Sequence, residues 1–247
     1  MVLYARERHR DGDIYTYDLD VRDPDGRLLE RWEGLRLHAV RKTDGSGPWV
    51  PALLGPYLER QVADLVPRAP RCVVQPDSEE GAQGQHARRV QTTAAVGRPL
   101  GKSTVVRHRG DGKPEVDDDV AVSASHNAGV TLAVASQGRV VRDAEQVGER
   151  PVEDWQALLG AEHFALAKLV RRERGEELSV AATRVWGAIE CLSKIGRAVA
   201  GPITLAESRL DGWVLLRAGQ AQIATFPAHL RDRTNPVVFT ILTEGSS

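Results

Sequence analysis

The sequence is poor in several features that would mark a particular class of protein. Its 247 residues include two cysteines, Cys72 and Cys191, which is too few for a disulfide framework, and no His/Cys cluster has zinc spacing. No uninterrupted apolar run approaches the roughly 18 residues that a membrane span needs, and the N-terminus lacks the charged-then-apolar order of a signal peptide. We therefore expect a cytoplasmic protein with reduced cysteines and no membrane partner.

An excess of charge of one sign is also absent. The chain has 33 Lys and Arg against 34 Asp and Glu, for a net charge of -1, which argues against nucleic acid as a bulk electrostatic partner. Its 41% hydrophobic and 27% charged residues are typical of a globular protein. Composition thus predicts a soluble globular chain and leaves its chemistry open.

The first third of the chain contains strand patterns followed by breakers. Residues 14–21 alternate apolar and polar side chains, Asp23–Gly26 is a turn sequence, and a second strand-like run follows over 28–40. We expect a β-hairpin or meander there, within a β-rich segment over residues 1–66 that is marginal alone. Prolines and glycines in 67–85 predict a linker or surface loop.

Helix and strand patterns alternate in residues 86–247, which we expect to form one α+β domain without internal repeats. The clearest helix spans 180–195, with Ser179 as a possible N-cap and Gly196 as a stop. Two further helices are expected over 86–96 and 152–172. Short strands are expected over 104–106, 120–124, 130–135, 213–216, 221–224 and 237–242.

Two weak motifs contain carboxylates. Trp186, Glu190 and Lys194 are spaced i, i+4, i+8 and share one helix face, although a core tryptophan beside a Glu/Lys pair is the simpler interpretation. Asp143 and Glu145 follow a strand at alternate positions, so that both point to one side and suit Mg²⁺; an exposed acidic strand end is the simpler alternative.

A third region is locally basic and contains Gly112-Lys113-Pro114 and Ser123-Ala124-Ser125-His126. Such a region suits a phosphate-rich ligand, although a solvated loop would also explain it. Ser125 and His126 do not indicate a serine hydrolase, because neighbouring side chains in a strand point apart and no nucleophile elbow is present.

Taken in order, these motifs resemble the G-K-P, S-x-S-H, D-x-E and W-x-x-x-E-x-x-x-K motifs of the 4′-phosphopantetheinyl transferase superfamily, over roughly residues 86–242. The resemblance implies a transferase-like fold with pseudosymmetric halves and a site within a single chain, with self-association as an alternative. Residues 1–60 look like the segment between the dehydratase and the C-terminal transferase regions of iterative enediyne polyketide synthases.

The resemblance implies Mg²⁺-dependent transfer of 4′-phosphopantetheine from coenzyme A to a serine of an acyl carrier protein of a polyketide synthase, with release of 3′,5′-ADP. Glu190 would accept the serine proton and Lys194 would stabilise the leaving group. The implied metal ligands are Asp143, Glu145 and Glu190, and the implied coenzyme A contacts are Lys113, Pro114, Ser125, His126 and Arg89.

Two positions depart from the family pattern, Val141 in place of a glycine and Ile189 in place of a lysine. They motivate an alternative, a catalytically degenerate module that docks coenzyme A or a carrier protein. Residues 152–174 follow the metal motif and are a candidate carrier surface, although Phe164 and Leu166 there are expected in the core. A third hypothesis makes residues 1–60 the functional tail of a hotdog-type dehydratase. It ranks last because the fragment has no paired His/Asp constellation.

Overall fold

The structure, a computed structural model, divides the chain into two compact units, Met1–Asp44 and Gly45–Ser247. The first unit therefore ends before residue 66, where the sequence placed the end of the β-rich segment. The residues described are 2–38, 48–66, 69–77, 85–100, 105–110, 113–116, 120–195, 201–231 and 233–244.

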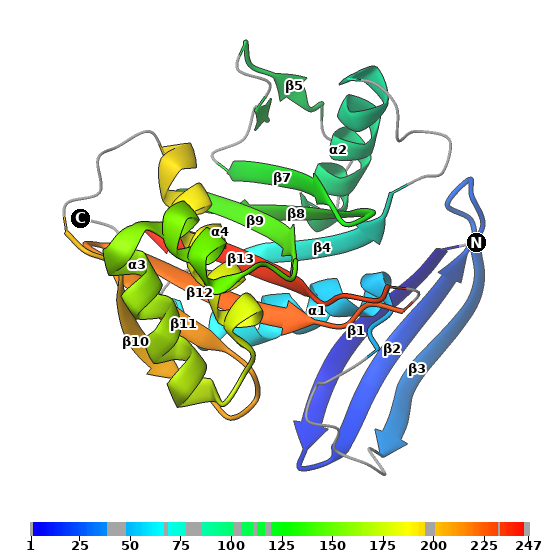
Figure 1. Cartoon of the computed structure of the whole chain (residues 1–247). Coiled ribbons are helices and arrows are strands. Elements are labelled where there is room, and N and C mark those ends of the chain that lie inside the picture. The colour runs from blue at the N-terminus through cyan, green and yellow to red at the C-terminus, as the bar shows by residue number, and fades with distance from the viewer. Residues whose placement is uncertain are drawn as a thin grey trace. The chain divides into compact units, whose positions relative to one another are not determined.

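The first unit is a three-stranded antiparallel meander in the order β1-β2-β3 (Figure 1). Its strands are β1 (Val2–Asp11), β2 (Ile14–Arg22) and β3 (Leu28–His38). Cross-strand partners share a face, and the pairs Leu3/Val21 and Leu19/Trp32 put apolar side chains together on one face. None of residues 2–38 is buried, so this sheet has no core of its own.

The opposite face of the meander is charged. Asp20 pairs with Arg22 at 2.9 Å and with Arg31 at 2.8 Å, and Asp18 accepts a hydrogen bond from Arg8 at 2.5 Å. The alternation predicted from residues 14–21 therefore produces a two-faced sheet, and the hairpin or meander prediction is confirmed as a meander.

The second unit contains four helices and ten strands within its described residues. The helices are α1 (Pro51–Ala63), α2 (Gln85–Leu100), α3 (Val152–Arg174) and α4 (Leu178–Ile195). The strands are β4 (Arg71–Pro76), β5 (Arg107–His108), β6 (Pro114–Glu115), β7 (Ala121–Asn127), β8 (Val130–Ser136), β9 (Val140–Gln146), β10 (Thr204–Ser208), β11 (Val214–Ala218), β12 (Ala221–Ala228) and β13 (Val237–Glu244).

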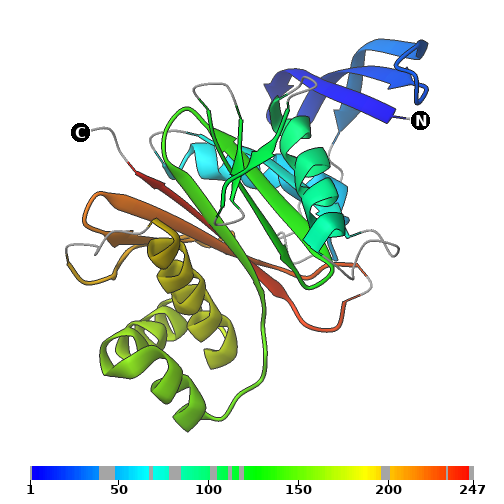
Figure 2. The same ribbon diagram turned by 90° about the horizontal axis from the view of Figure 1, so that it is seen from above.

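The two larger sheets of this unit are separate layers, each covered by helices. The order is β4-β8-β7 in one and β10-β11-β12-β13-β9 in the other. Helices α3 and α4 pack on one face of the five-stranded sheet, and α1 with β4 and β8 packs on its other face. Helix α2 covers the three-stranded sheet from outside. Figure 2 shows this succession of layers from above.

The sequence missed strands of the second unit, among them β4, β6 and β10, and misplaced a helix start. Residues 71–76, assigned to a linker, form β4 with Cys72 and Val74 buried, because the apolar run Cys72-Val73-Val74 pairs with β8 despite the flanking prolines. Helix α4 begins at Leu178, so Ser179 lies inside it and is not its N-cap. Gly196, the expected stop, lies outside the described residues.

The α+β class is confirmed, and the expected helices 86–96, 152–172 and 180–195 correspond to α2, α3 and α4. The specific transferase-like fold with pseudosymmetric halves is not shown. Phe164 and Leu166 are 5% and 8% exposed, as expected of core residues. Within the described part of the chain, no helix combines the length and apolar character needed to cross a membrane.

Candidate functional site

The edge strands β7 and β9 of the two larger sheets lie close together, and a pocket of about 420 Å³ opens beside them. Helix α4 contributes to its wall, and so does the short hairpin β5-β6. Its lining includes five predicted site residues, Lys113, Pro114, Ser125, His126 and Lys194. Residues separated by as many as 81 positions thus meet at one pocket. Gly112, from the same predicted motif, lies outside the described residues.

Close packing of α4 places its charged residues beside β9. A Cβ on Gly187 would lie 2.5 Å from Thr240 Oγ1, so only glycine allows α4 to approach β13 this closely. Thr240 is the cross-strand partner of Asp143 and therefore shares its face. Asp143 thus lies under the helix turn that carries Glu190 and Lys194.

An ion pair joins β9 to α4 at this point. Lys194 Nζ donates to Asp143 Oδ1 at 2.6 Å, and the side chains are 33% and 6% exposed. Lys113 Nζ donates to the Lys194 carbonyl at 3.1 Å. Asp143 Oδ2 is buried without a hydrogen-bond partner, which leaves one lone-pair-bearing oxygen of a buried carboxylate unsatisfied.

Glu145 lies next to this pair on the same face of β9. Burial raises its pKa above the ordinary range, and the charges of Asp143 and Glu190 add to this effect. A hydrogen bond of 2.9 Å from Asn127 Nδ2 and the charge of Lys194 oppose it. The charges of Asp143, Glu190 and Lys194 therefore all act on Glu145.

The three carboxylates do not form a ready-made metal cage. No group of three or more His, Cys, Asp or Glu among the described residues is placed to hold a metal ion. Mg²⁺, however, is commonly held by one or two carboxylates together with phosphate oxygens of a ligand. The unpartnered Asp143 Oδ2 and its carboxylate neighbours fit that shared mode of binding.

His126 is fixed by hydroxyl groups on both sides of its ring. Thr92 Oγ1 lies 2.9 Å from Nε2, and Thr131 Oγ1 lies 2.7 Å from Nδ1. Thr131 also donates to Asp77 Oδ1 at 2.6 Å, so Thr131 links the Asp77 carboxylate to the His126 ring. This network fixes the orientation of the ring at the pocket wall.

Arg89 lies apart from the pocket residues. Its side chain on α2 is exposed, and its charge, after burial, is the second cause that lowers the pKa of His108 on β5. The described residues that line the pocket include neither Arg89 nor the three carboxylates, but the carboxylates interact with the lining residue Lys194 or with one another, whereas Arg89 does not. The structure therefore brings together the predicted residues on β6, β7, β9 and α4, and leaves this one outside.

Three residues beside the pocket were not predicted: Asp77, Asn127 and Arg142. Asp77 and Asn127 act through hydrogen bonds to Thr131 and Glu145, contacts that no sequence spacing reveals. Arg142 lines the pocket and is 4% exposed, and its burial lowers its pKa to about 9. The sequence did contain one signal for Arg142: it is a charged residue within an apolar strand pattern, directly before Asp143.

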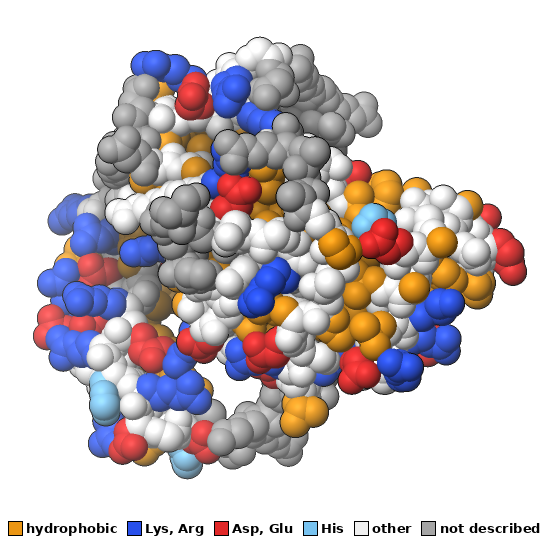
Figure 3. All heavy atoms as spheres, turned by 90° about the vertical axis from the view of Figure 1, so that its left-hand side faces the viewer, with side chains coloured by type: hydrophobic (Ala, Val, Ile, Leu, Met, Phe, Trp, Pro, Cys, Tyr) orange, Lys and Arg blue, Asp and Glu red, His pale blue; other side chains and the backbone are white. Residues whose placement is uncertain are grey.

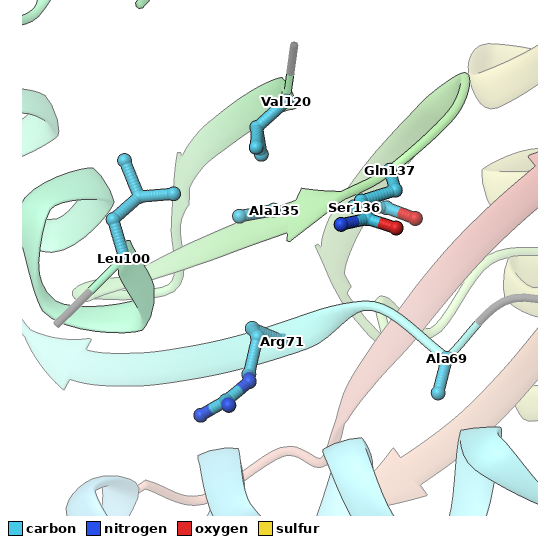
Figure 4. A pocket seen from close by; sticks show the side chains of 7 residues that line it. All are labelled: Ala69, Arg71, Leu100, Val120, Ala135, Ser136 and Gln137. Carbon is cyan, nitrogen blue, oxygen red and sulfur yellow. The ribbon is translucent and has the colours of Figure 1, made fainter. Parts of the chain in front are cut away.

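A larger hollow of about 750 Å³ lies elsewhere, on the three-stranded sheet near the end of α2. Its labelled side chains are mostly small or aliphatic, and the guanidinium of Arg71 points away from Ala135 and Gln137 (Figure 4). Arg71 lies 3.8 Å from Glu59 of α1. Because no described charged side chain is directed into this hollow, the smaller pocket is the stronger candidate site.

The side of the second unit on which α3 and β10 lie carries charges of both signs. Basic and acidic side chains are interspersed there (Figure 3), and α3 has acidic residues in its first turn and basic residues in its last. Val152 and Leu158 are its exposed large apolar residues, at 49% and 39%. The exposed part of α3 is therefore rich in charged residues, and Phe164 and Leu166 do not contribute an apolar surface to it.

Comparison with known proteins gives one family. Residues 1–47 match the family model of the polyketide synthase dehydratase N-terminal domain. The match covers less than a fifth of the chain and lies almost wholly in the first unit. No curated protein matches the chain.

This finding corrects the assignment of family and activity. The family found is a polyketide synthase domain and not a phosphopantetheinyl transferase, so the predicted membership, transfer reaction and transferase activity are contradicted. The sequence resemblance misled because each of its four motifs is short. The polyketide synthase context is supported, and the dehydratase-related hypothesis, ranked last from the sequence, is the one that the match favours.

Proposed function

We propose that this chain is part of a polyketide synthase, in which the first unit belongs to a dehydratase-related module. The family match over residues 1–47 supports this assignment. The exposed apolar face around Leu3 and Trp32, 62% and 46% exposed, supports it further, because such a sheet needs a partner surface to be stable. The predicted cytoplasmic location accords with this context.

For the second unit we propose a binding function: its pocket holds a divalent cation together with a phosphate-bearing ligand of the coenzyme A type. The observation that carries this proposal is the meeting of Lys113, His126 and Lys194 at one pocket, with the Asp143 carboxylate paired to Lys194 beside it. Cationic side chains beside a buried carboxylate suit a metal–phosphate pair, because the metal neutralises the carboxylate and the cations neutralise the phosphate.

Mg²⁺ is the cation we propose, with Asp143 and Glu190 as its protein ligands and Glu145, which accepts a hydrogen bond from Asn127, beside them. When bound, the ion would neutralise phosphate charge and fix the orientation of the phosphate oxygens. Lys194 would exchange its contact with Asp143 for one with the phosphate. His126 and Ser125 would line the pocket beside the ligand, and Lys113 would hold its far end.

An acyl carrier protein domain of the synthase is the proposed macromolecular partner. The chemistry is shared, because the prosthetic arm of a carrier protein is the phosphopantetheine part of coenzyme A. Coenzyme A should therefore compete with a holo carrier domain for the pocket, whereas the apo carrier domain, without the arm, should bind more weakly.

Calorimetric titration of the purified chain with coenzyme A, with and without Mg²⁺, tests the proposal. We expect Mg²⁺ to tighten binding, and Asp143→Asn or Glu190→Gln to abolish the Mg²⁺-dependent gain of about tenfold or more. Glu207→Gln, an exposed carboxylate on β10, is the matched control and should bind as the wild type does. Binding that is indifferent to Mg²⁺ in all four proteins would refute the metal assignment.

A further inference from the structure

Arg142 is the most deeply buried cation beside the pocket, and sequence reasoning gave it no role. Side chains alternate along β9, so Arg142 lies on the face of Val140 and Ala144, which belong to the first core cluster, and Asp143 lies on the α4 face. Because β9 is the edge strand of its sheet, the pocket reaches both of its faces. Arg142 and Lys194 therefore line one pocket from two directions.

The guanidinium of Arg142 feels the charge of Asp143, but its contact with that carboxylate is not an ion pair. Its Nε is buried without a hydrogen-bond partner, and no hydrogen bond or ion pair joins Arg142 to the rest of the described chain. The neighbouring Asp143 accepts its hydrogen bond from Lys194. By contrast, the other buried arginine, Arg184, has both a carboxylate and carbonyl partners.

A buried, unpaired charge is strongly unfavourable unless an opposite charge accompanies it. The guanidinium offers five N–H donors in a planar fork, which matches the oxygens of a phosphate group. The neighbouring pocket residues Lys113 and Lys194 are cations as well, so the missing partner is an anion supplied by the ligand.

We propose that Arg142 is an anion-binding residue at the inner wall of the pocket and that a phosphate group of the ligand is its partner. This inference rests on the proposed function and deepens it. Cationic groups on both faces of β9, Lys194 on one and Arg142 on the other, suit a ligand with more than one phosphate, as coenzyme A has. The arm of a holo carrier protein has one phosphate and satisfies only one of the two groups, so it should bind more weakly than coenzyme A.

The test uses the full chain with Arg142→Met, which keeps an unbranched side chain of similar length and removes the charge. We expect its coenzyme A affinity, measured by calorimetry, to fall by about 10- to 100-fold, the value of a charge-assisted hydrogen bond. Arg142→Lys should lose part of this affinity, because it keeps the charge and lacks the fork. Arg217→Met, at an exposed position of β11, is the control and should bind normally.

The thermal midpoint without ligand separates this role from a structural one. Removing an unpaired buried charge should raise the Tm of Arg142→Met by about 2 to 4 °C, whereas the loss of a structural arginine would lower it. A lower Tm, or coenzyme A affinity equal to that of the wild type, would overturn the inference.

Inorganic pyrophosphate without Mg²⁺ distinguishes failure of this inference from failure of the proposed function. If the wild type binds pyrophosphate and Arg142→Met does not, the anion site stands even if coenzyme A proves not to be the ligand. If the wild type binds coenzyme A and the variant binds it equally well, only the role of Arg142 falls. Binding of neither probe to the wild type overturns both.

Discussion

Replacing Lys194 by methionine tests the central electrostatic feature of the second unit. The ammonium lies 2.6 Å from Asp143 Oδ1, and the Asp143 side chain is 6% exposed. Because Oδ2 is already without a partner, Lys194→Met leaves a buried carboxylate with no hydrogen bond from a cation on either oxygen. Removing one partner of a buried pair costs about 3 to 5 kcal/mol, and the one-third exposure of Lys194 reduces this to roughly 2 to 4 kcal/mol.

Urea unfolding and thermal melting measure this loss. For a domain of this size, we expect the Tm to fall by roughly 5 to 12 °C. Asp143→Asn in the same background removes the uncompensated charge and should recover a large part of the loss, so that the double-mutant cycle gives a coupling of about 1 to 3 kcal/mol. Lys168→Met is the control: this exposed lysine lies over the Phe164 ring, and its loss should cost less than about 1 kcal/mol.

Mg²⁺ should rescue the Lys194→Met variant. In the wild type the cation competes with the ammonium for Asp143, whereas in the variant it meets an unpaired carboxylate. Millimolar Mg²⁺ should therefore raise the Tm of the variant more than that of the wild type. An equal response in both proteins, or a loss below about 0.5 kcal/mol in Lys194→Met, would refute the reasoning about this pair.

Three further predictions concern stability. Arg184→Met should cost about 3 to 5 kcal/mol in urea unfolding, because the fully buried guanidinium makes two 2.9 Å hydrogen bonds to Glu176; a loss below 1 kcal/mol would contradict this. In the first unit, arginine hydrogen bonds lower the pKa of Asp20 to about 2; their stabilisation is complete above the unfolded value of about 3.9 and disappears as the pH falls towards 2. Acid titration followed by circular dichroism should show this loss, and Asp20→Asn should remove it. Gly187→Ala should cost about 1 to 3 kcal/mol through its clash with Thr240, and Thr240→Ala in the same protein should restore most of it; lack of rescue would place the strain elsewhere.

Local sequence patterns predicted the helices and strands that have a clear hydrophobic periodicity. The alternation in residues 14–21 became β2 of the meander, and the helix expected over 180–195 became α4. Strand β4 was missed because the prolines and glycines of residues 67–85 outweighed its three apolar residues, and pairing with β8 stabilises it. Short strands depend on partners distant in the chain, so a local window cannot identify them.

The candidate site residues were also predicted only in part. Side-chain type and spacing selected Asp143, Glu145 and Lys194, which the structure places together, but they also selected Arg89, which lies outside the pocket. Family and activity could not be read from the same short motifs, and the match to a dehydratase domain corrected them. A few matching residues show which side-chain chemistry is available. Membership of a family requires sequence agreement over a long stretch of the chain.

The sequence by itself determined the α+β class, the two-faced N-terminal sheet and the presence of carboxylates and cations in the second unit, because these follow from composition and from periods of 2 and 3.6 residues. The tertiary structure alone decided that Gly187 brings α4 against β13, that Lys194 neutralises Asp143, and that Arg142 is buried without a partner. Each of these depends on the distance between residues far apart in the chain, and that distance is fixed only when the two sheets and their helices pack.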